Sequence, residues 1–490
     1  MAIRDINRYQ MILENQLEDW VSSDNPVRFI SALVLKFYNE QPELFNSEKG
    51  HKNTGRRAYN PAAMLMLFLY GYLNRMNSSR RLEAETYRNM EVIWLLGNDR
   101  PDHKTISDFR KDNGKLISSM AKEFRLFLKN EGFISGSIQA FDGTKVKALA
   151  KKDSINLNDV KKRIFEMEKD LESYVKLLDS NDCKENQEDL ATAPELEVIR
   201  LNAQIANLTN QLNEQTRLLA LMEEKGIKDY YSNDADARKM KSLDGYIPGY
   251  NVQMGVDSKN MMITSDFVSL DGGDQKLLKQ NVEASKEQIG IYPETALADK
   301  GYATTSEMLD VEANGFTECI VAMPETTEMR KEALGVTFEY NQELDCFHCA
   351  KGEKLVRKFE KTKNGECITI YQVTKNPCKN CSLFGVCTKD KKQGRRVELK
   401  SNFKEMMKFR RRSKTEDYIQ KFQRRKAIIE HVFGTIKTWM GKIPLLLTTK
   451  QKVQIEVDLY ATCYNLRRLF NICPMSELLN KLDKYATQVA

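Results

Sequence analysis

The apolar positions in the first part of the chain repeat at the spacings of helices. An Asn-Pro pair opens an apolar run over residues 60–73, which predicts a helix that begins at the proline. Further helices are predicted over residues 78–87, where two serines can cap the start, and over 105–124, where Thr105 can do so. We therefore expect a helical N-terminal domain over residues 1–130.

Two later stretches alternate as strands and helices do. The first is a β-rich run that ends at Asp142-Gly143-Thr144, which predicts a strand with a carboxylate at its tip. The second predicts strands over 250–256 and 261–270, a helix over 274–288, a strand over 295–298, a helix over 306–313 and a strand over 319–323. This order is typical of an α/β core, here formed by residues 131–150 and 231–324.

A helical hairpin is predicted over residues 151–230, between the two parts of this core. Apolar residues recur at spacings of three and four over 160–178 and again over 198–222, and the polar linker 181–194 separates the two runs. The segment holds twelve basic and seventeen acidic residues. Because it is acidic, we expect it to pair with itself or with a partner subunit and not to embrace DNA.

The C-terminal third is predicted to contain three parts. Residues 325–400 are rich in cysteine and read as loops, whereas residues 401–475 are helical and basic. Within the latter, an amphipathic helix over 414–439 has an apolar stripe that includes Ile429 and Val432. Residues 476–490 are expected to form a tail.

Composition and charge exclude several classes of protein. The chain of 490 residues is 41% hydrophobic and 30% charged, which is ordinary for globular domains and excludes a disordered or collagenous chain. The longest apolar stretch is about 12 residues, short of the ~20 that span a bilayer, and the N-terminus lacks the apolar part of a signal peptide. We therefore expect no membrane partner and a reducing cytosol for the ten cysteines.

The distribution of charge points to nucleic acid. The net charge is +7, but residues 400–450 contain fourteen Lys or Arg and four Asp or Glu. Basic turns in the N-terminal helices, which include Arg56, Arg57, Arg80, Arg81 and Arg110, are typical of helical DNA-binding domains. The alternative for these turns is a packing domain with a solvated basic face.

Three acids stand out by their positions. Asp142 and Asp299 follow predicted strands, and Glu430 lies within the long basic helix. Carboxylates at the ends of neighbouring strands converge at one edge of a sheet, and hard cations such as Mg²⁺ prefer oxygen ligands. Any one of these acids alone would more often be a turn residue or a solvated charge. Asp274, beside a middle strand, is a candidate for a supporting role, with a structural turn residue as the alternative.

The close cysteine pairs have the spacing of a structural zinc site. They form Cys346-x2-Cys349 and Cys378-x2-Cys381-x5-Cys387. A regular zinc ribbon would use the first four of these cysteines. A reduced cluster without metal is the alternative.

Several ordered motifs resemble the DDE transposases of the IS1182 group, within the broader IS4-like class of bacterial insertion sequences. The three motifs that match the catalytic blocks of that group are Phe141 to Thr144 (FDGT), Ala298 to Tyr302 (ADKGY) and Ile429 to Lys437 (IEHVFGTIK). Residues 101–107 (PDHKTIS) resemble its N-terminal domain, and residues 234–253 resemble the stretch that leads into its second strand. One departure is that Gln423 and Lys426 stand where the related class often has Tyr and Arg.

The resemblance implies a fold and a set of metal ligands. The fold is multidomain α+β: a helical N-terminal DNA-binding domain precedes an RNase H-like α/β catalytic core, interrupted by the helical hairpin and by a cysteine-rich zinc-ribbon-like insertion. Asp142, Asp299 and Glu430 would bind Mg²⁺ or Mn²⁺, with two ions expected. The resemblance favours Cys349, Cys378, Cys381 and Cys387 as the ligands of structural Zn²⁺.

The predicted function is that of a DNA transposase. It would cut at the terminal inverted repeats of an insertion sequence and join the freed 3′-hydroxyl to target DNA, in the bacterial cytoplasm at the nucleoid. Synapsis of two ends would need at least a homodimer. The alternatives are a nuclease or resolvase without strand transfer and a catalytically silent DNA-binding regulator. Cations fix register on the phosphate backbone, and the predicted DNA contacts are Arg56, Arg57, Arg80, Arg81, Lys300, Arg425, Lys426 and Lys437.

Overall fold

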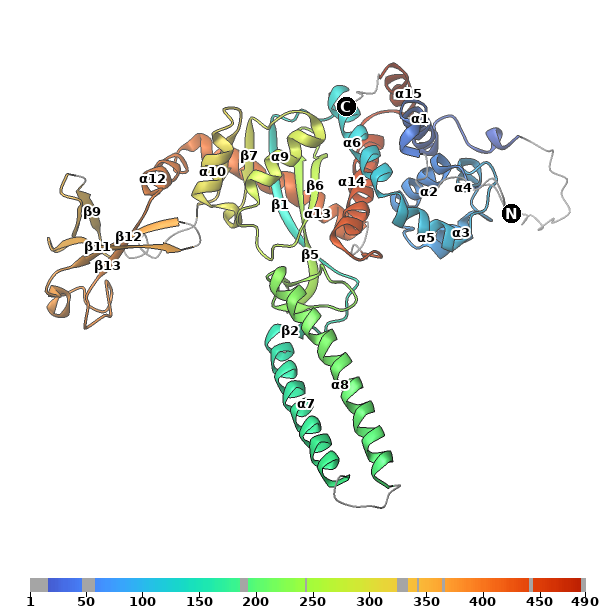
Figure 1. The fold of residues 1–490 in the computed structure, drawn as a ribbon. Helices are drawn as coiled ribbons and strands as arrows, with labels where there is room; N and C mark the ends of the chain where they lie inside the picture. The colour runs from blue at the N-terminus through green and yellow to red at the C-terminus, as the bar shows by residue number, and fades with distance from the viewer. Residues whose placement is uncertain are drawn as a thin grey trace, which may run out of the picture.

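The computed structural model describes residues 16–45, 58–185, 193–242, 245–323, 334–341, 343–363, 366–439 and 444–485. The chain is a mixed α+β protein with a helical N-terminal part, a central sheet covered by helices, a long helical arm and a second sheet (Figure 1). Arg56 and Arg57 lie outside the described residues.

The N-terminal part is helical, as predicted. Its elements are η1 (Leu17–Trp20), α1 (Pro26–Glu40), η2 (Pro42–Phe45), α2 (Pro61–Leu73), α3 (Ser79–Glu85), α4 (Met90–Leu95), α5 (His103–Asp112) and α6 (Gly114–Asn130). The predicted start of α2 is confirmed, because the side chain of Asn60 accepts a hydrogen bond of 2.8 Å from the N–H of Ala62. The apolar residues of this helix are buried.

The single helix predicted over residues 105–124 is two helices. Asp102, not Thr105, caps α5, because its carboxylate accepts the N–H of Thr105 at 2.9 Å. The amide side chain of Asn113 donates to the carbonyl of Phe109 and ends the helix. At Gly114, where α6 begins, a Cβ would lie 2.5 Å from the Cδ1 of Ile455. The break in the helix therefore coincides with a close approach of the C-terminal helix that carries Ile455.

Within the described residues, six strands form the central sheet. They are β1 (Ile138–Lys147), β4 (Arg238–Ser242), β5 (Gly245–Asp257), β6 (Ile263–Ser269), β7 (Thr295–Ala298) and β8 (Glu318–Val321). β5 pairs antiparallel with β1, β4 and β6, whereas β1, β7 and β8 are parallel to one another. The strand predicted over 295–298 is confirmed at both ends.

The strand expected to end at Asp142 continues to Lys147. On one side, β1 pairs with β5 as far as Lys147, so the strand stays extended. On the other side, its pairing with β7 ends where Phe141 faces Ala298. Asp142 is therefore within its strand, but it stands at the end of the parallel pairing.

Helices cover both faces of the sheet. α9 (Leu278–Ile289) and α10 (Thr305–Glu312) pack on one face, against Phe141, Ala296 and Ala298. α13 (Glu416–Trp439) packs on the other face, and its buried residues share a core with Ala140, Leu297 and Ile320. This alternation follows from the period of two along a strand.

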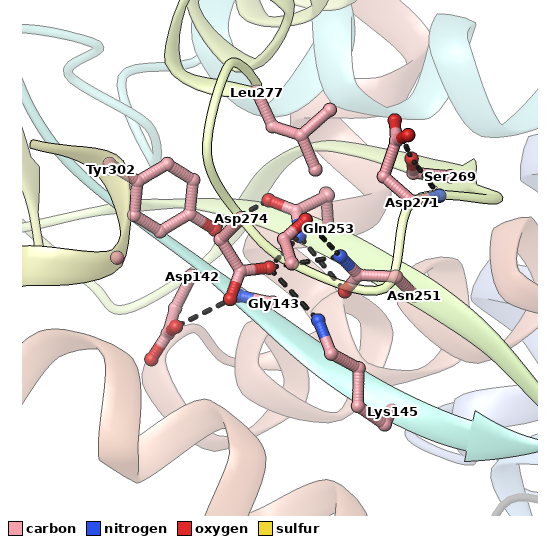
Figure 2. A network of polar contacts seen from close by, with 12 residues as sticks. Asp142, Gly143, Lys145, Asn251, Gln253, Ser269, Asp271, Asp274, Leu277 and Tyr302 are labelled. Carbon is pink, nitrogen blue, oxygen red and sulfur yellow. Dashed lines mark hydrogen bonds and ion pairs between the residues drawn. The ribbon is translucent and has the colours of Figure 1, made fainter. Parts of the chain in front are cut away.

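α9 begins at Leu278, four residues after the predicted start. Lys276 has a φ of +67°, outside the helical region, so the chain reaches the helix through a loop. Asp274 consequently lies in a loop that follows β6, beside the central sheet (Figure 2).

The predicted hairpin forms an arm that projects from the core (Figure 1). α7 (Leu157–Glu185) and α8 (Ala193–Glu224) lie side by side, and β2 (Ile155–Asn156) pairs with β3 (Asp229–Tyr230) at the base of the arm. Val160, Met222 and Ile227 are buried together near this base.

The sequence predicts loops for the cysteine-rich stretch, and this prediction is wrong. It forms a second, five-stranded sheet of β9 (Phe338–Asn341), β10 (Cys346–Cys349), β11 (Lys354–Lys363), β12 (Glu366–Val373) and β13 (Arg396–Lys400), and the 3-10 helix η4 (Pro377–Asn380) lies between the last two. The sheet has a small core of its own around Phe347, Leu355 and Tyr371. The strands have no clear pattern in the sequence. Gly, Lys and Asn are frequent in this stretch, and the small sheet buries few side chains, so few apolar residues mark its strands.

The C-terminal helices join the parts of the chain. They are α12 (Phe403–Arg412), α13, α14 (Lys450–Ile472) and α15 (Met475–Lys484). The residues expected to form a tail are helical as far as Lys484, and Leu478 and Leu482 of α15 are buried in the main core.

α14 contributes buried polar groups between the N-terminal helices and the central sheet. Arg110 of α5 is 3% exposed, donates to the hydroxyl of Tyr72 at 3.1 Å and lies 3.9 Å from Glu456 of α14. The interpretation of Arg110 as part of a basic DNA-binding face is therefore wrong, because this side chain is used for packing.

A second buried group surrounds Arg125 of α6. Arg125 forms an ion pair with Asp266 of β6, and the amide of Gln454 donates to both Asp266 and Asp458 at 2.9 Å. Burial and the neighbouring Asp266 raise the pKa of Asp458 well above its usual range, whereas Arg125 lowers it. One guanidinium therefore compensates two buried acids.

We expect Arg125→Met to lower the free energy of unfolding by about 3–5 kcal/mol, because it leaves buried acids without their cation. Urea denaturation followed by circular dichroism measures this change. Lys161→Met is the control, because Lys161 pairs with Glu223 where both side chains are 50% exposed, and such pairs contribute about 0–1 kcal/mol. Equal unfolding midpoints for the two variants would contradict this prediction.

Candidate active site

Asp142 lies on the face of the sheet that α13 covers. One oxygen of its carboxylate accepts the N–H of Gly143 at 2.8 Å. The other is 2.9 Å from Nη2 of Arg425 on α13, and the two side chains are 24% and 13% exposed. The carboxylate is thus mostly removed from solvent and held by one cation.

Asp299 follows β7 and lies beside Asp142. The parallel register joins Phe141 to Ala298, and an aspartate follows each of these residues in the chain, Asp142 within β1 and Asp299 just after β7; neighbouring strands are about 4.8 Å apart. The carboxylate of Asp299 accepts the N–H of Gly301 at 2.7 Å and caps the short helix η3 (Lys300–Tyr302). The two predicted acids are therefore brought together by strand pairing and by a local turn.

The electrostatics of Asp142 reflect this crowding. Burial is the largest cause that raises its pKa, to about 6, and the carboxylates of Asp299 and Asp274 add to the effect. Arg425 and the N–H of Gly143 act in the opposite direction. The pKa of Tyr302 is also raised, first by burial and then by Asp274, Asp142 and Asp299.

Asp274 belongs to the same group of side chains, on the opposite face of β1 (Figure 2). One of its oxygens accepts hydrogen bonds from Lys145 at 3.0 Å, from Asn251 at 2.9 Å and from Gln253 at 2.9 Å. From its place beside a strand, Asp274 is predicted only to have a supporting role, and no motif in the sequence identifies Lys145, Asn251 or Gln253. The two glycines before Asp274 were the available signal, because they break the helical pattern ahead of α9.

Glu430 lies on α13 but on its exposed side. Helix geometry separates Glu430 from Arg425 by about 140° around the axis, so the guanidinium and not the carboxylate faces Asp142. Within the part of the chain that the structure describes, the carboxylate of Glu430 makes no hydrogen bond or ion pair. The third predicted acid is therefore on the helix that packs over the two aspartates, without contacting them.

The predicted DNA contacts fall into separate groups. Lys300 and Lys426 are exposed near the candidate site, on η3 and α13, and Arg80 and Arg81 are exposed on α3. Lys437 lies in α13, but its side chain is outside the described ones. His431 approaches the hydroxyl of Tyr464 at 3.2 Å, a contact between α13 and α14.

Four cysteines line one cavity next to the second sheet. They are Cys349, Cys378, Cys381 and Cys387, whereas Cys346 is buried in β10 and is not among the described residues around the cavity. The sulfur of Cys378 accepts the N–H of Arg395, and that of Cys381 accepts the N–H of Leu383, both at 3.4 Å.

Among the described residues, no group of three or more His, Cys, Asp or Glu side chains is arranged to hold a metal ion. The chemistry of the donors nevertheless fits the expected metals, since carboxylate oxygens suit Mg²⁺ and thiolates suit Zn²⁺.

Comparisons with known families identify the class of this protein. Residues 15–112 match the family model described as Transposase domain (DUF772), and residues 348–470 match the Transposase DDE domain. Two segments of the chain are therefore similar to transposase domains. Their combination is typical of transposases of the IS1182 family, so the resemblance noted from the sequence motifs is confirmed.

Comparisons with curated proteins and with solved structures found no match. The matched DDE segment contains Glu430, but Asp142 and Asp299 precede it. No helix among the described residues is long and apolar enough to cross a membrane.

The raised pKa of Asp142 predicts a pH-dependent stability. The folded chain binds this proton more tightly than the unfolded chain, whose Asp has a pKa near 3.8. The contribution of Asp142 to the free energy of unfolding is therefore most favourable below pH 4, falls as the pH rises to about 6 and is constant above that.

We expect Asp142→Asn to remove this dependence. Relative to wild type, the variant should gain up to about 3 kcal/mol of stability between pH 4 and pH 7, at 1.36 kcal/mol per pKa unit. Urea denaturation in metal-free buffer at each pH measures it, with Asp271→Asn as the control, since Asp271 bonds Ser269. Parallel pH profiles for wild type and Asp142→Asn would contradict the prediction.

Proposed function

We propose that this chain is the DNA transposase of an insertion sequence, which cleaves the element's ends and transfers the freed 3′-hydroxyl to target DNA. The observation that carries the proposal is the pair of aspartates, Asp142 and Asp299, each of which comes one residue after the last parallel pair of β1 and β7, with Asp142 bound to Arg425 of the basic helix α13. The match to a transposase DDE domain supports the same function.

The arrangement of strands supports an RNase H-like core. The order β6-β5-β1-β7-β8 is antiparallel on one side of β1 and parallel on the other, with helices on both faces. In this core, Asp142, Asp299 and Glu430 are the proposed acidic triad, although the carboxylate of Glu430 lies on the exposed side of α13, away from the two aspartates. Divalent ions such as Mg²⁺ or Mn²⁺, two of which are expected, would activate the attacking oxygen and stabilise the leaving one.

The side chains of the site prepare it for a polyanion. Asp142 and Asp299 concentrate negative charge that only a cation can compensate. Because Asp142 is largely buried, its ionised carboxylate is unfavourable without a cation beside it. Arg425 neutralises part of this charge and, with Lys300 and Lys426, offers donors to phosphate oxygens. The same side chains therefore favour a phosphodiester, with a divalent cation between its oxygens and the acids, over a neutral substrate.

The partner is double-stranded DNA, both the terminal inverted repeats and the target. The N-terminal helices, with Arg80 and Arg81 exposed on α3, are the proposed region for binding the repeats. At least a dimer is needed to hold two ends together.

We expect Asp142→Asn, Asp299→Asn and Glu430→Gln each to lower the rate of Mg²⁺-dependent end cleavage by at least about 100-fold, because each removes a negative ligand while keeping the shape. The measurement is cleavage of a labelled DNA that carries the element's end. Asp271→Asn and Glu416→Gln are matched controls outside the site.

The same assay separates the proposed reaction from its rivals. Supplying ends that are already cut, with an unrelated plasmid, should give joined products, whereas a nuclease gives hydrolysis alone. DNA binding with no cleavage in any divalent ion would favour a silent regulator. Retained cleavage in all three triad variants would refute the assignment of the site.

We also propose that Cys349, Cys378, Cys381 and Cys387 bind a structural Zn²⁺. The support is that these four line one cavity and that two of their sulfurs accept backbone N–H groups. With four thiolates a site is closed, so its role is to fold the zinc-ribbon-like insertion, not to take part in the chemistry.

Substitution of these cysteines tests the zinc proposal. We expect Cys381→Ser or Cys387→Ser to lower the bound zinc from about one ion per chain to far below one, because a tetrahedral site loses one of its four ligands. Cys346→Ser should retain the zinc, since Cys346 lies in β10 away from the cavity. Zinc per chain is measured by mass spectrometry of the metal, and loss in Cys346→Ser instead would favour the regular ribbon set.

A further inference from the structure

Asp274 is connected to the turn that carries Asp299 through a chain of polar contacts (Figure 2). The Nε2 of Gln253 donates to Asp274 at 2.9 Å. Its Oε1 accepts the hydroxyl of Tyr302, and also the amide of Asn281 at 2.8 Å. Tyr302 is in turn the last residue of η3, which Asp299 caps.

The acceptor at Asp274, together with the side-chain oxygen of Asn251 at 3.0 Å, fixes the orientation of the Gln253 amide. An amide has one donating and one accepting end, so a carboxylate on one side selects the nitrogen for that side. The oxygen then faces Tyr302 and Asn281, both of which donate to it. Gln253 is fully buried, so water does not compete for either end.

Tyr302 holds the turn in place. Its side chain is fully buried among the residues that α9 and α10 pack against, and its N–H donates to the carbonyl of Asp299 at 3.1 Å. A turn fixed at Tyr302 keeps Asp299 beside β1. The side chain of Asp299 completes the turn through its bond to Gly301.

Gly143 leaves the space that this network needs. A Cβ at Gly143 would lie 2.2 Å from Nε2 of Gln253, 2.6 Å from Oδ1 of Asp274 and 2.8 Å from Oδ1 of Asn251. The residue after Asp142 therefore has to lack a side chain for Asp274 to reach β5.

We propose that Asp274 is a positioning residue, which orients Asp299 through Gln253 and Tyr302. The inference rests on the proposed function, because Asp299 is there a metal ligand. Asp274 acts on the turn from the face of β1 that Gly143 occupies, opposite to the face of Asp142. Its ion pair with Lys145 at 3.0 Å keeps its oxygen directed into the network.

The turn itself provides a test that does not depend on activity. In the full chain, Asp274→Ala and Tyr302→Phe should each speed amide hydrogen exchange in residues 299–303 by about 10-fold. Asp274→Ala removes the carboxylate that accepts from Gln253, Tyr302→Phe removes the hydroxyl that donates to Gln253, and this is the effect expected for the loss of one such hydrogen bond. Asp274→Asn keeps an acceptor oxygen and should restore most of the protection. Asp271→Ala, in the same loop, should leave exchange unchanged because Asp271 bonds Ser269.

Binding of Mn²⁺ without DNA tests the consequence for the site. Asp274→Ala should weaken binding about 10-fold, measured by electron paramagnetic resonance of the free ion, as loss of a positioning partner does in metal sites. Adding Asp274→Ala to Tyr302→Phe should cost little more than Tyr302→Phe alone, because both act along one path. Additive losses, or exchange in Asp274→Ala equal to that in Asp271→Ala, would overturn the inference.

The two proposals fail in different ways. If Asp142→Asn and Asp299→Asn bind Mn²⁺ as wild type does, the proposed metal site is wrong, while the exchange experiment still decides whether Asp274 orients the turn. If these two variants lose Mn²⁺ and Asp274→Ala does not, the site stands and the positioning role is wrong. An Asp274→Asn variant as impaired as Asp274→Ala would assign the effect to the charge next to Lys145 and would also overturn the inference.

Discussion

The pairing of β1 on both of its sides is the constraint on which the rest of the site depends. β5 holds the strand extended past Asp142, and β7 stops one residue earlier. Because side chains alternate along a strand, Asp142 faces α13 while Gly143 faces the loop that carries Asp274. A shift of register by one residue would exchange these faces and would separate the acid from its cation.

Buried polar contacts make the N-terminal helices continuous with the core. α14 presents Glu456 toward Arg110 and Tyr72, and presents Asp458 toward Arg125 and Asp266. Apolar residues around these groups form one core that runs from Val21 to Tyr485. The N-terminal helices and the sheet that carries Asp142 and Asp299 would therefore move as one unit, since a buried polar contact has defined partners.

The sequence predicted those helices and strands whose ends are set by residues close to them in the chain. The helix after Asn60, the strand over 295–298 and the two helices of the arm follow from caps, breakers and periodicity, and they are confirmed. Predictions failed where residues far away in the sequence determine the end of an element. Pairing with β5 extends β1 beyond Asp142, and Ile455 lies against the break between two helices at Gly114. The second sheet was missed for the same reason, because its strands are stabilised by one another.

In the candidate site, too, the sequence identifies some residues, whereas others are found only from contacts between distant parts of the chain. Motifs identified Asp142 and Asp299, and strand pairing explains why they are neighbours. The contact between Lys145 and Asp274 joins residues 129 positions apart, which no spacing in the sequence reveals. The exposed orientation of Glu430 depends on how α13 packs, and the motif contains no information about that.

The base of the arm has a consequence for how such proteins diversify. The chain leaves and re-enters the core through paired residues, Ile155 with Tyr230 and Asn156 with Asp229, and a small apolar cluster closes the base. The pairing at the base sets the positions of the two chain ends of the arm independently of its length. The length of α7 and α8 can therefore change without a change in the register of the central strands.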